Sequence, residues 1–156
     1  MRIVIQRVKE ASVEVEGAIV GAIDQGLLLL VGFGRDDEAV INDINLEKIS
    51  SKILNLRCFS DEEGKMNLSV SDVEGAILAV SQFTLYGNLR KGNRPSFGSA
   101  LEPDKANLFF ERFCESLRKG AQVNTGVFGA DMKVNLLNDG PVTFILDSTE
   151  ILGPRK

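Results

Sequence analysis

Apolar and polar residues alternate over the first part of the chain, the pattern of strands with one buried face. The alternation covers residues 2–8 and 11–16, and glycines at 17 and 21 then flank a short apolar segment. This spacing predicts a hairpin that leads into another strand near residues 18–23. The run LLLLVGF follows Gly26, and it is short enough to be a strand that is covered on both faces.

Two segments carry apolar residues at helical spacing. Isoleucines at 41, 44, 49 and 53 predict a helix over about 37–54, and the preceding RDD (35–37) supplies a carboxylate for its N-cap. Pro103 suits the first turn of a second helix, which Gly120 ends. The apolar face of this helix is predicted to comprise Ala106, Phe109, Phe110, Phe113 and Leu117.

Further strands are predicted near residues 56–59 and along GAILAVSQFTLYG (75–87), the longest strand candidate in the chain. A final hairpin is expected from 131–137 and 142–147, with NDGPVT (138–143) around its turn. Antiparallel strands that do not alternate strictly with two main helices predict an α+β fold with mostly antiparallel sheets, barrel-like or sandwich-like. The length of 156 residues predicts one domain over 1–156.

The chain contains no histidine, which excludes a Ser-His-Asp triad, a Cys-His pair and an imidazole general base. Cys58 and Cys114 stand far apart in the sequence and are expected to be buried thiols. Without histidine or clustered cysteines we expect neither a tightly bound metal nor another cofactor. Catalysis would therefore have to use hydroxyl, carboxylate, lysine or backbone groups, or the substrate itself.

The net charge of −4 and the pI near 5.0 argue against a broad surface for nucleic acid. A local basic patch stands in NLRKGNRPSF, and it is a candidate clamp for a phosphate backbone: Arg90, Lys91 and Arg94. No apolar run approaches the length of a membrane span, and the alternating amino-terminal segment is unlike a secretory signal. We therefore expect a cytoplasmic protein with no membrane partner.

Polar residues end the strand AILAV, where Ser81, Gln82 and Thr84 precede a glycine. Hydroxyl and amide groups at a strand end are well placed to contact a ligand, although a strand that surfaces into solvent gives the same pattern. Thr84 as a nucleophile would need an adjacent base, and no carboxylate or lysine lies near it in the sequence. A hydrogen-bonding role for Thr84 is favoured over a covalent one.

Pro141 is out of place in the predicted hairpin, because it stands where the returning strand begins and has no N–H to donate. Gly140-Pro141 is either a trans entry into the strand or a cis turn. The cis form would point two backbone carbonyls the same way, as a pair of acceptors. The local sequence does not decide between them.

Five segments in this order resemble the D-aminoacyl-tRNA deacylase family: QRVKEASVEVEG, SQFTLYG, KGNRPSF, FGADM and NDGPVTFILDS. The resemblance spans essentially residues 1–150 and includes both signature motifs of the family, SQFTL and NDGPVT. It implies the fold of that family and a homodimer with its active site at the subunit interface. It also implies a hydrolase that edits tRNA by cleaving D-amino acids, and glycine mischarged onto other tRNAs, from the tRNA 3′ end.

By position, the resemblance assigns roles to residues of this chain. Gly140 and Pro141 would form a cis element that reaches into the partner's site and rejects L-amino acids, with Arg7 holding it in place. Met132 would pack beside the pocket, and tRNA would contact the basic patch at 90–94. The catalytic pocket would be lined by Ser81, Gln82, Phe83 and Thr84.

The family mechanism assigns much of the catalysis to the 2′-hydroxyl of the terminal ribose, with N–H groups around Phe83 stabilising the oxyanion. This would account for the absence of histidine. Two other functions stay open on the residues alone. One is an esterase for free D-amino acid esters that uses Thr84, and the other is a non-catalytic RNA-binding module.

Overall fold

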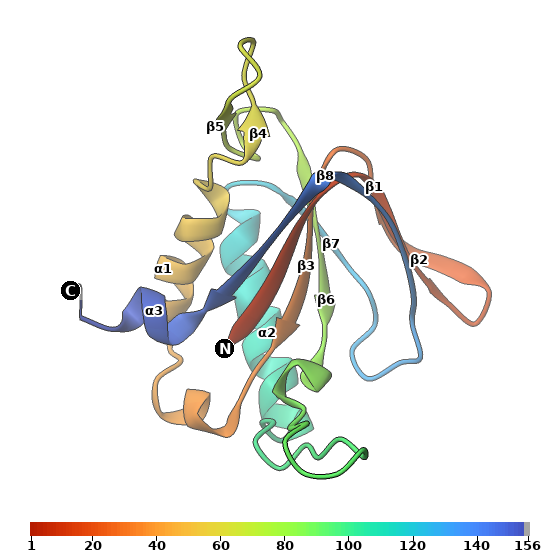
Figure 1. Ribbon diagram of the computed structural model, residues 1–156, viewed down its shortest axis with the longest axis vertical. Helices are drawn as coiled ribbons and strands as arrows, with labels where there is room; N and C mark the ends of the chain where they lie inside the picture. The colour runs from red at the N-terminus through yellow and green to blue at the C-terminus, as the bar shows by residue number, and fades with distance from the viewer. Residues whose placement is uncertain (155–156) are drawn as a thin grey trace.

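A curved six-stranded sheet forms the centre of the computed structural model, which describes residues 1–154 (Figure 1). The strands follow the order β2-β1-β3-β6-β7, and β8 pairs with the other edge of β1. The β1 strand is antiparallel to its three neighbours, whereas β6 is parallel to both β3 and β7. The strands of this sheet are β1 (Arg2–Val15), β2 (Ala18–Ile23), β3 (Gly26–Gly32), β6 (Ala76–Ser81), β7 (Gln122–Thr125) and β8 (Lys133–Asp147).

The sheet curves until β2 lies close to β7. A Cβ atom added at Gly21 of β2 would meet the carbonyl of Thr125 at the end of β7. The predicted α+β class with a barrel-like antiparallel sheet is confirmed, and the parallel pairs at β6 are an addition that the local patterns did not show. A separate hairpin, β4 (Phe59–Ser60) and β5 (Met66–Leu68), projects from one end of the molecule in Figure 1.

The β1 strand is one long element rather than the two that its sequence predicts. Residues 2–8 lie between β3 and β8, and residues 11–15 lie between β2 and β8. Irregular pairing around Lys9 explains the break in the alternation, because the strand bends there without ending. The predicted strand at 18–23 and the strand covered on both faces at Gly26 are confirmed as β2 and β3.

The predicted carboxy-terminal hairpin is wrong. Residues 133–138 and 143–147 both pair with β1, so the chain continues in one direction as the single strand β8. Only Arg7 separates Gln6 from Val8, whereas residues 139–142 separate their partners Thr143 and Asn138. The turn-forming residues therefore make a bulge that leaves the sheet instead of a reversal of the chain.

The first predicted helix is divided in two. A 3-10 turn, η1 (Arg35–Ala39), precedes α1 (Asp43–Leu54), and the N-cap of α1 is Asn42, whose side chain accepts the N–H of Asn45 at 2.9 Å. Asp37, from the predicted capping segment, is buried instead against the amino group of Met1. The Asp37 carboxylate also accepts the Gly34 N–H at 2.6 Å, so it caps the short η1 turn and not the main helix.

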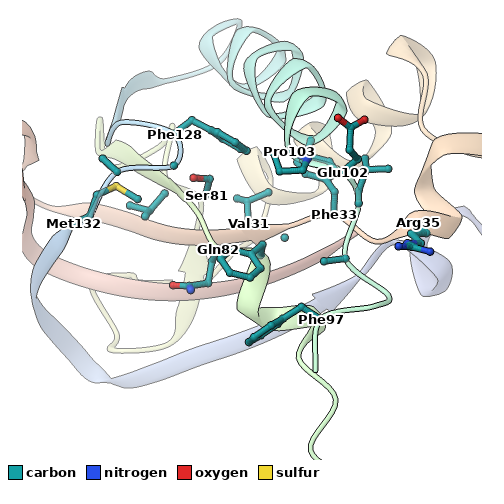
Figure 2. Close-up of a pocket in the computed structure, with 18 of the residues that line it drawn as sticks. Val31, Phe33, Arg35, Ser81, Gln82, Phe97, Glu102, Pro103, Phe128 and Met132 are labelled. Carbon is teal, nitrogen blue, oxygen red and sulfur yellow. The ribbon is translucent and has the colours of Figure 1, made fainter. Parts of the chain in front are cut away.

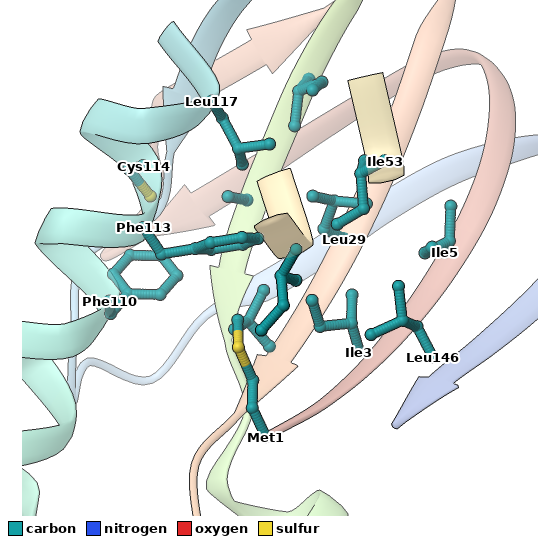
Figure 3. Close-up of a cluster of buried hydrophobic side chains, with 14 of the residues drawn as sticks. Met1, Ile3, Ile5, Leu29, Ile53, Phe110, Phe113, Cys114, Leu117 and Leu146 are labelled. Atoms are coloured by element: carbon teal, nitrogen blue, oxygen red, sulfur yellow. The ribbon is translucent and has the colours of Figure 1, made fainter. Parts of the chain in front are cut away.

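The second predicted helix is confirmed as α2 (Pro103–Arg118), with the proline in its first turn. Its apolar face packs with α1 against one face of the sheet, as Figure 3 shows for Phe110, Phe113 and Leu117 beside Leu29 of β3. Cys58 and Cys114 are both buried and free. The last helix is α3 (Ser148–Leu152), and no helix among residues 1–154 is long and apolar enough to cross a membrane.

The SQFTLYG segment does not extend its strand. β6 ends at Ser81, and residues 83–86 form a 3-10 turn, η2 (Phe83–Tyr86), so β1 and β8 are the longest strands. The parallel neighbours β3 and β6 both end here, after a run of buried apolar residues. The polar end of β6 is thereby placed at an edge of the sheet.

Candidate active site

A pocket of about 900 Å³ opens at the carboxyl ends of β3 and β6. Parallel strands end at the same edge of a sheet, so residues 31–33 and 80–83 meet there. The first turn of α2 and the loop at 128–132 complete the wall, which is mostly apolar (Figure 2). A largely apolar cavity of this size with a few polar groups is typical of a site for an organic ligand.

The structure brings four of the expected pocket residues together: Ser81, Gln82, Phe83 and Met132 all line the cavity. In Figure 2, Ser81 and Gln82 project from the end of β6, and Met132 lies beside Ser81 on the loop that leads into β8. Thr84 is next to this group but is exposed and does not line the cavity.

The η2 turn is attached to the sheet and carries Phe83 at the mouth of the pocket. The N–H of Gln82 donates to the carbonyl of Val31 at 2.8 Å, and the Gln82 amide donates to the Thr84 hydroxyl. The Phe83 ring is 57% exposed and packs against Phe97, with ring centroids 5.0 Å apart. The first N–H groups of such a turn have no partner within it, so they are available to an anion.

A network beneath η2 fixes the turn from below. Arg2 donates to the Leu85 carbonyl at 3.0 Å and stacks over the Tyr86 ring at 4.5 Å. Tyr86 donates to Asp37 at 3.3 Å. Burial, followed by the nearby charge of Asp37, raises the pKa of the Tyr86 phenol. Tyr86 is therefore a neutral hydrogen-bond donor at all ordinary pH values.

The bulge in β8 presents Gly140 and Pro141 to the surface. Both residues are exposed, and their peptide bond is cis. Arg7 holds the base of the bulge, because its Nε donates to the Asp139 carbonyl at 2.9 Å while its Nη1 donates to the Cys58 carbonyl at 2.7 Å. The Arg7 side chain is almost completely buried, and its contact with Cys58 is buried while that with Asp139 is partly buried, so both are strong charge-assisted hydrogen bonds.

Asn138 is a second support of the bulge that the sequence reading missed. Its side-chain oxygen accepts the Val142 N–H at 3.1 Å, and its amide donates to the Val142 carbonyl at 3.0 Å. The amide also donates to the Arg7 carbonyl at 3.2 Å. Asparagine side chains commonly hydrogen-bond to the backbone of turns, and this preference could have indicated the role of Asn138 from the sequence.

The bulge does not reach the pocket of its own chain. It lies opposite Arg7, which pairs with Leu27, and Leu27 in turn pairs with Ile77 of β6. Ser81 stands four residues further along β6, or about 13 Å along the strands, and β1 and β3 lie between β8 and β6. Gly140 and Pro141 are accordingly absent from the lining of the cavity.

The predicted basic patch lies on the loop between η2 and α2. An isolated bridge joins Asn88 to Ser96, and the exposed tip between them carries Arg90, Lys91 and Arg94. None of the three forms an ion pair with another residue in the described range, 1–154. In the same range, no group of three acidic or cysteine residues is arranged to hold a metal ion.

The fold and the pocket define a protein with a candidate active site, and comparison with known proteins gives its family and its enzyme class, a hydrolase. The family model for D-Tyr-tRNA(Tyr) deacylase matches residues 4–147. The chain belongs to this family, and it acts on the ester bond of D-aminoacyl-tRNA. The predicted family and the predicted enzyme class are confirmed.

Two solved structures share this fold. One, described as c-Myc DNA Unwinding Element Binding Protein, is 43% identical with a TM-score of 0.85, and the match covers 94% of this chain and 98% of that chain. Another is described as a "probable eukaryotic D-amino acid tRNA deacylase". It is 20% identical with a TM-score of 0.80, covers 93% of this chain and 97% of that chain, and supports the fold.

Proposed function

We propose that the protein hydrolyses D-aminoacyl-tRNA, and glycine mischarged on tRNA, and that it rejects L-aminoacyl-tRNA through Gly140-Pro141 of a partner subunit. The products are free D-amino acid and tRNA. The observation that carries the proposal is the separation of two parts: a pocket at Ser81 and Gln82, and an exposed Gly-Pro bulge held far from it.

The exposed bulge supports a homodimer with shared sites. Arg7 and Asn138 hydrogen-bond to the backbone on either side of Gly140-Pro141, at Asp139 and Val142, and so fix the bulge in one position. β8 is an edge strand, and it leaves Leu137 54% and Ile145 77% exposed. Apolar side chains on an open edge strand are commonly covered by another chain.

The selectivity follows from a surface made of backbone. A Cβ atom at Gly140 would lie 2.5 Å from Cγ2 of Val142, so only glycine fits there. Two fixed carbonyls beside the α-carbon of the substrate would conflict with an L side chain. A D side chain projects the other way and glycine projects nothing, so the same filter accepts both.

The chemistry is proposed to rest on the substrate. The Thr84 hydroxyl accepts a hydrogen bond from the Gln82 amide, and Thr84 does not line the pocket. Both observations favour a positioning role for Thr84 over a nucleophilic one. The 2′-hydroxyl beside the ester would assist its hydrolysis, and the N–H groups at Phe83 would stabilise the oxyanion. Tyr86 and Arg2 hold the η2 turn, which carries Phe83, in place.

The first experiment compares D- and L-aminoacyl-tRNA at equal enzyme concentration. Hydrolysis of the D form with survival of the L form is expected. A terminal 2′-deoxyadenosine should slow turnover sharply, and undiminished turnover would remove the role of the 2′-hydroxyl. Thr84→Ala should retain appreciable activity. Turnover of free D-amino acid ester alone, or salt-sensitive RNA binding without product, would replace the proposal with one of the two other functions.

Mixed dimers test whether the site is shared. One variant, Gly140→Val, damages the bulge, and another, Gln82→Ala, damages the pocket. A mixed dimer unites the intact pocket of the first protomer with the intact bulge of the second, so mixing the two variants should restore activity and discrimination at one site in each mixed dimer. A mixture with no more activity than the separate variants would contradict a site that is shared between subunits.

A further inference from the structure

The pocket extends beyond the end that carries Ser81 and Gln82. Ser81 and Met132 lie toward one end in Figure 2, whereas Arg35 and Glu102 lie toward the other. Its volume of about 900 Å³ is near the upper limit for a site that encloses a drug-sized ligand. The end beyond Phe33 is therefore available to a part of the substrate other than the aminoacyl group.

Arg35 is the guanidinium group that lines this far end. It is exposed and forms no ion pair with any carboxylate of residues 1–154. The neighbouring acid Glu38 is already paired with Lys105, and Glu102 is the other acid at this end. Arg35 thus keeps its donors for a ligand, and guanidinium groups suit phosphate.

The backbone at Arg35 is fixed relative to both the pocket and the basic loop. Its N–H donates to the Ser99 carbonyl at 2.9 Å, and Gly34 forms a bridge with Ala100. Arg35 lies four residues beyond Val31, which pairs with Ser81. The loop runs outward from Ser99 to the tip that carries Arg90 and Arg94, so cationic groups extend from the pocket to the surface.

We propose that Arg35 binds the phosphate that joins the terminal adenosine of tRNA to the nucleotide before it. The inference rests on the proposed function, since it takes the ester to lie at Ser81 and Gln82. One nucleoside then lies between the ester and the first phosphate, and this phosphate meets the first cation on the way out of the pocket. The loop residues would contact phosphates further along the RNA.

The test uses three substrates that differ in phosphate content: 3′-O-D-tyrosyl-adenosine, the D-tyrosyl ester of the dinucleotide CpA, and D-tyrosyl-tRNA. Arg35→Ala should lower kcat/KM about tenfold for the two substrates with a phosphate, mainly through KM, and leave the adenosine ester within twofold. It should also reduce the slope of log(kcat/KM) against log[salt] by about 0.7 for CpA. Arg35→Lys should restore part of the loss.

Two controls separate this role from a structural one. Arg112→Ala removes another exposed arginine, on α2 and outside the pocket, and should change none of the three substrates. Binding of unesterified CpA and adenosine, measured by calorimetry, requires no catalysis, so it tests Arg35 even if the proposed function fails. An equal loss on all substrates and ligands, or no loss on any, would overturn the proposal.

Discussion

Replacement of Arg7 is expected to destabilise the fold and to weaken chiral discrimination together. The guanidinium donates to the carbonyls of Asp139 and Cys58, which belong to different elements. Arg7→Ala leaves both acceptors without this donor, the Cys58 carbonyl in a buried place and the Asp139 carbonyl in a partly buried one. At about 1.5–3 kcal/mol for each hydrogen bond to a charged group, the expected cost is about 3–6 kcal/mol, a large share of the stability of an ordinary domain.

The assay combines unfolding in urea with hydrolysis of D- and L-aminoacyl-tRNA. Arg7→Lys keeps the charge and can reach one carbonyl at a time, so it should lose about half as much stability and remain folded for kinetics. In the lysine variant, the ratio of D to L hydrolysis should fall, because the bulge is less firmly held. Arg57→Ala is the matched control, since Arg57 is exposed and donates to a single carbonyl, that of Asn67, at 3.0 Å.

Two results would contradict this role of Arg7. If Arg7→Ala unfolds at the same urea concentration as Arg57→Ala, the contacts of Arg7 with Asp139 and Cys58 do not stabilise the fold. If Arg7→Lys loses stability but keeps the full ratio of D to L hydrolysis, Arg7 supports the fold without positioning the bulge.

Three further predictions concern the bulge, the η2 turn and the core. Asn138→Ala should cost about 1–3 kcal/mol in urea unfolding and lower discrimination, whereas Asn138→Asp should lose less, because it keeps the acceptor for the Val142 N–H. Gly34→Ala places a Cβ 2.9 Å from Cζ of Tyr86, so activity should fall, and Tyr86→Ala in the same chain should not lower it further. Burial raises the pKa of the Cys114 thiol from 9.0 to about 12. The unfolded chain therefore loses this proton first, and stability falls as the pH rises from 9 toward 12. In Cys114→Ala, the slope of the unfolding free energy against pH should be flatter by up to about 1.4 kcal/mol per pH unit.

Local patterns predicted the elements whose partners lie nearby. The alternation of β2, the apolar run of β3 and the amphipathic face of α2 each record burial directly in the sequence. The β8 strand was mistaken for a hairpin because its partner, β1, is more than a hundred residues away. Asp37 caps the η1 turn and not the long helix predicted for it, and its ion pair with the distant Met1 could not be derived from the local pattern. Long-range pairing leaves no periodic signal.

The candidate site was visible where polar residues interrupt an apolar strand, at Ser81 and Gln82. Arg35 and Phe128 were missed because they enter the pocket from segments that are distant in the sequence. Asn138 stands in the NDGP motif, but its contacts with Val142 depend on the bulge and could not be derived from a hairpin. Sequence reasoning thus found the polar end of one strand, and the topology supplied the rest of the wall.

The two halves of the proposed shared site are tied to one strand. Arg2 holds the η2 turn through Leu85, and Arg7 holds the bulge through Asp139. Arg7 lies five residues after Arg2 along β1, a span of about 17 Å that cannot stretch because β3 and β8 pair with both edges of the strand. In a symmetric dimer, the same fixed span sets where each bulge meets the other pocket, so one strand determines the geometry of both sites.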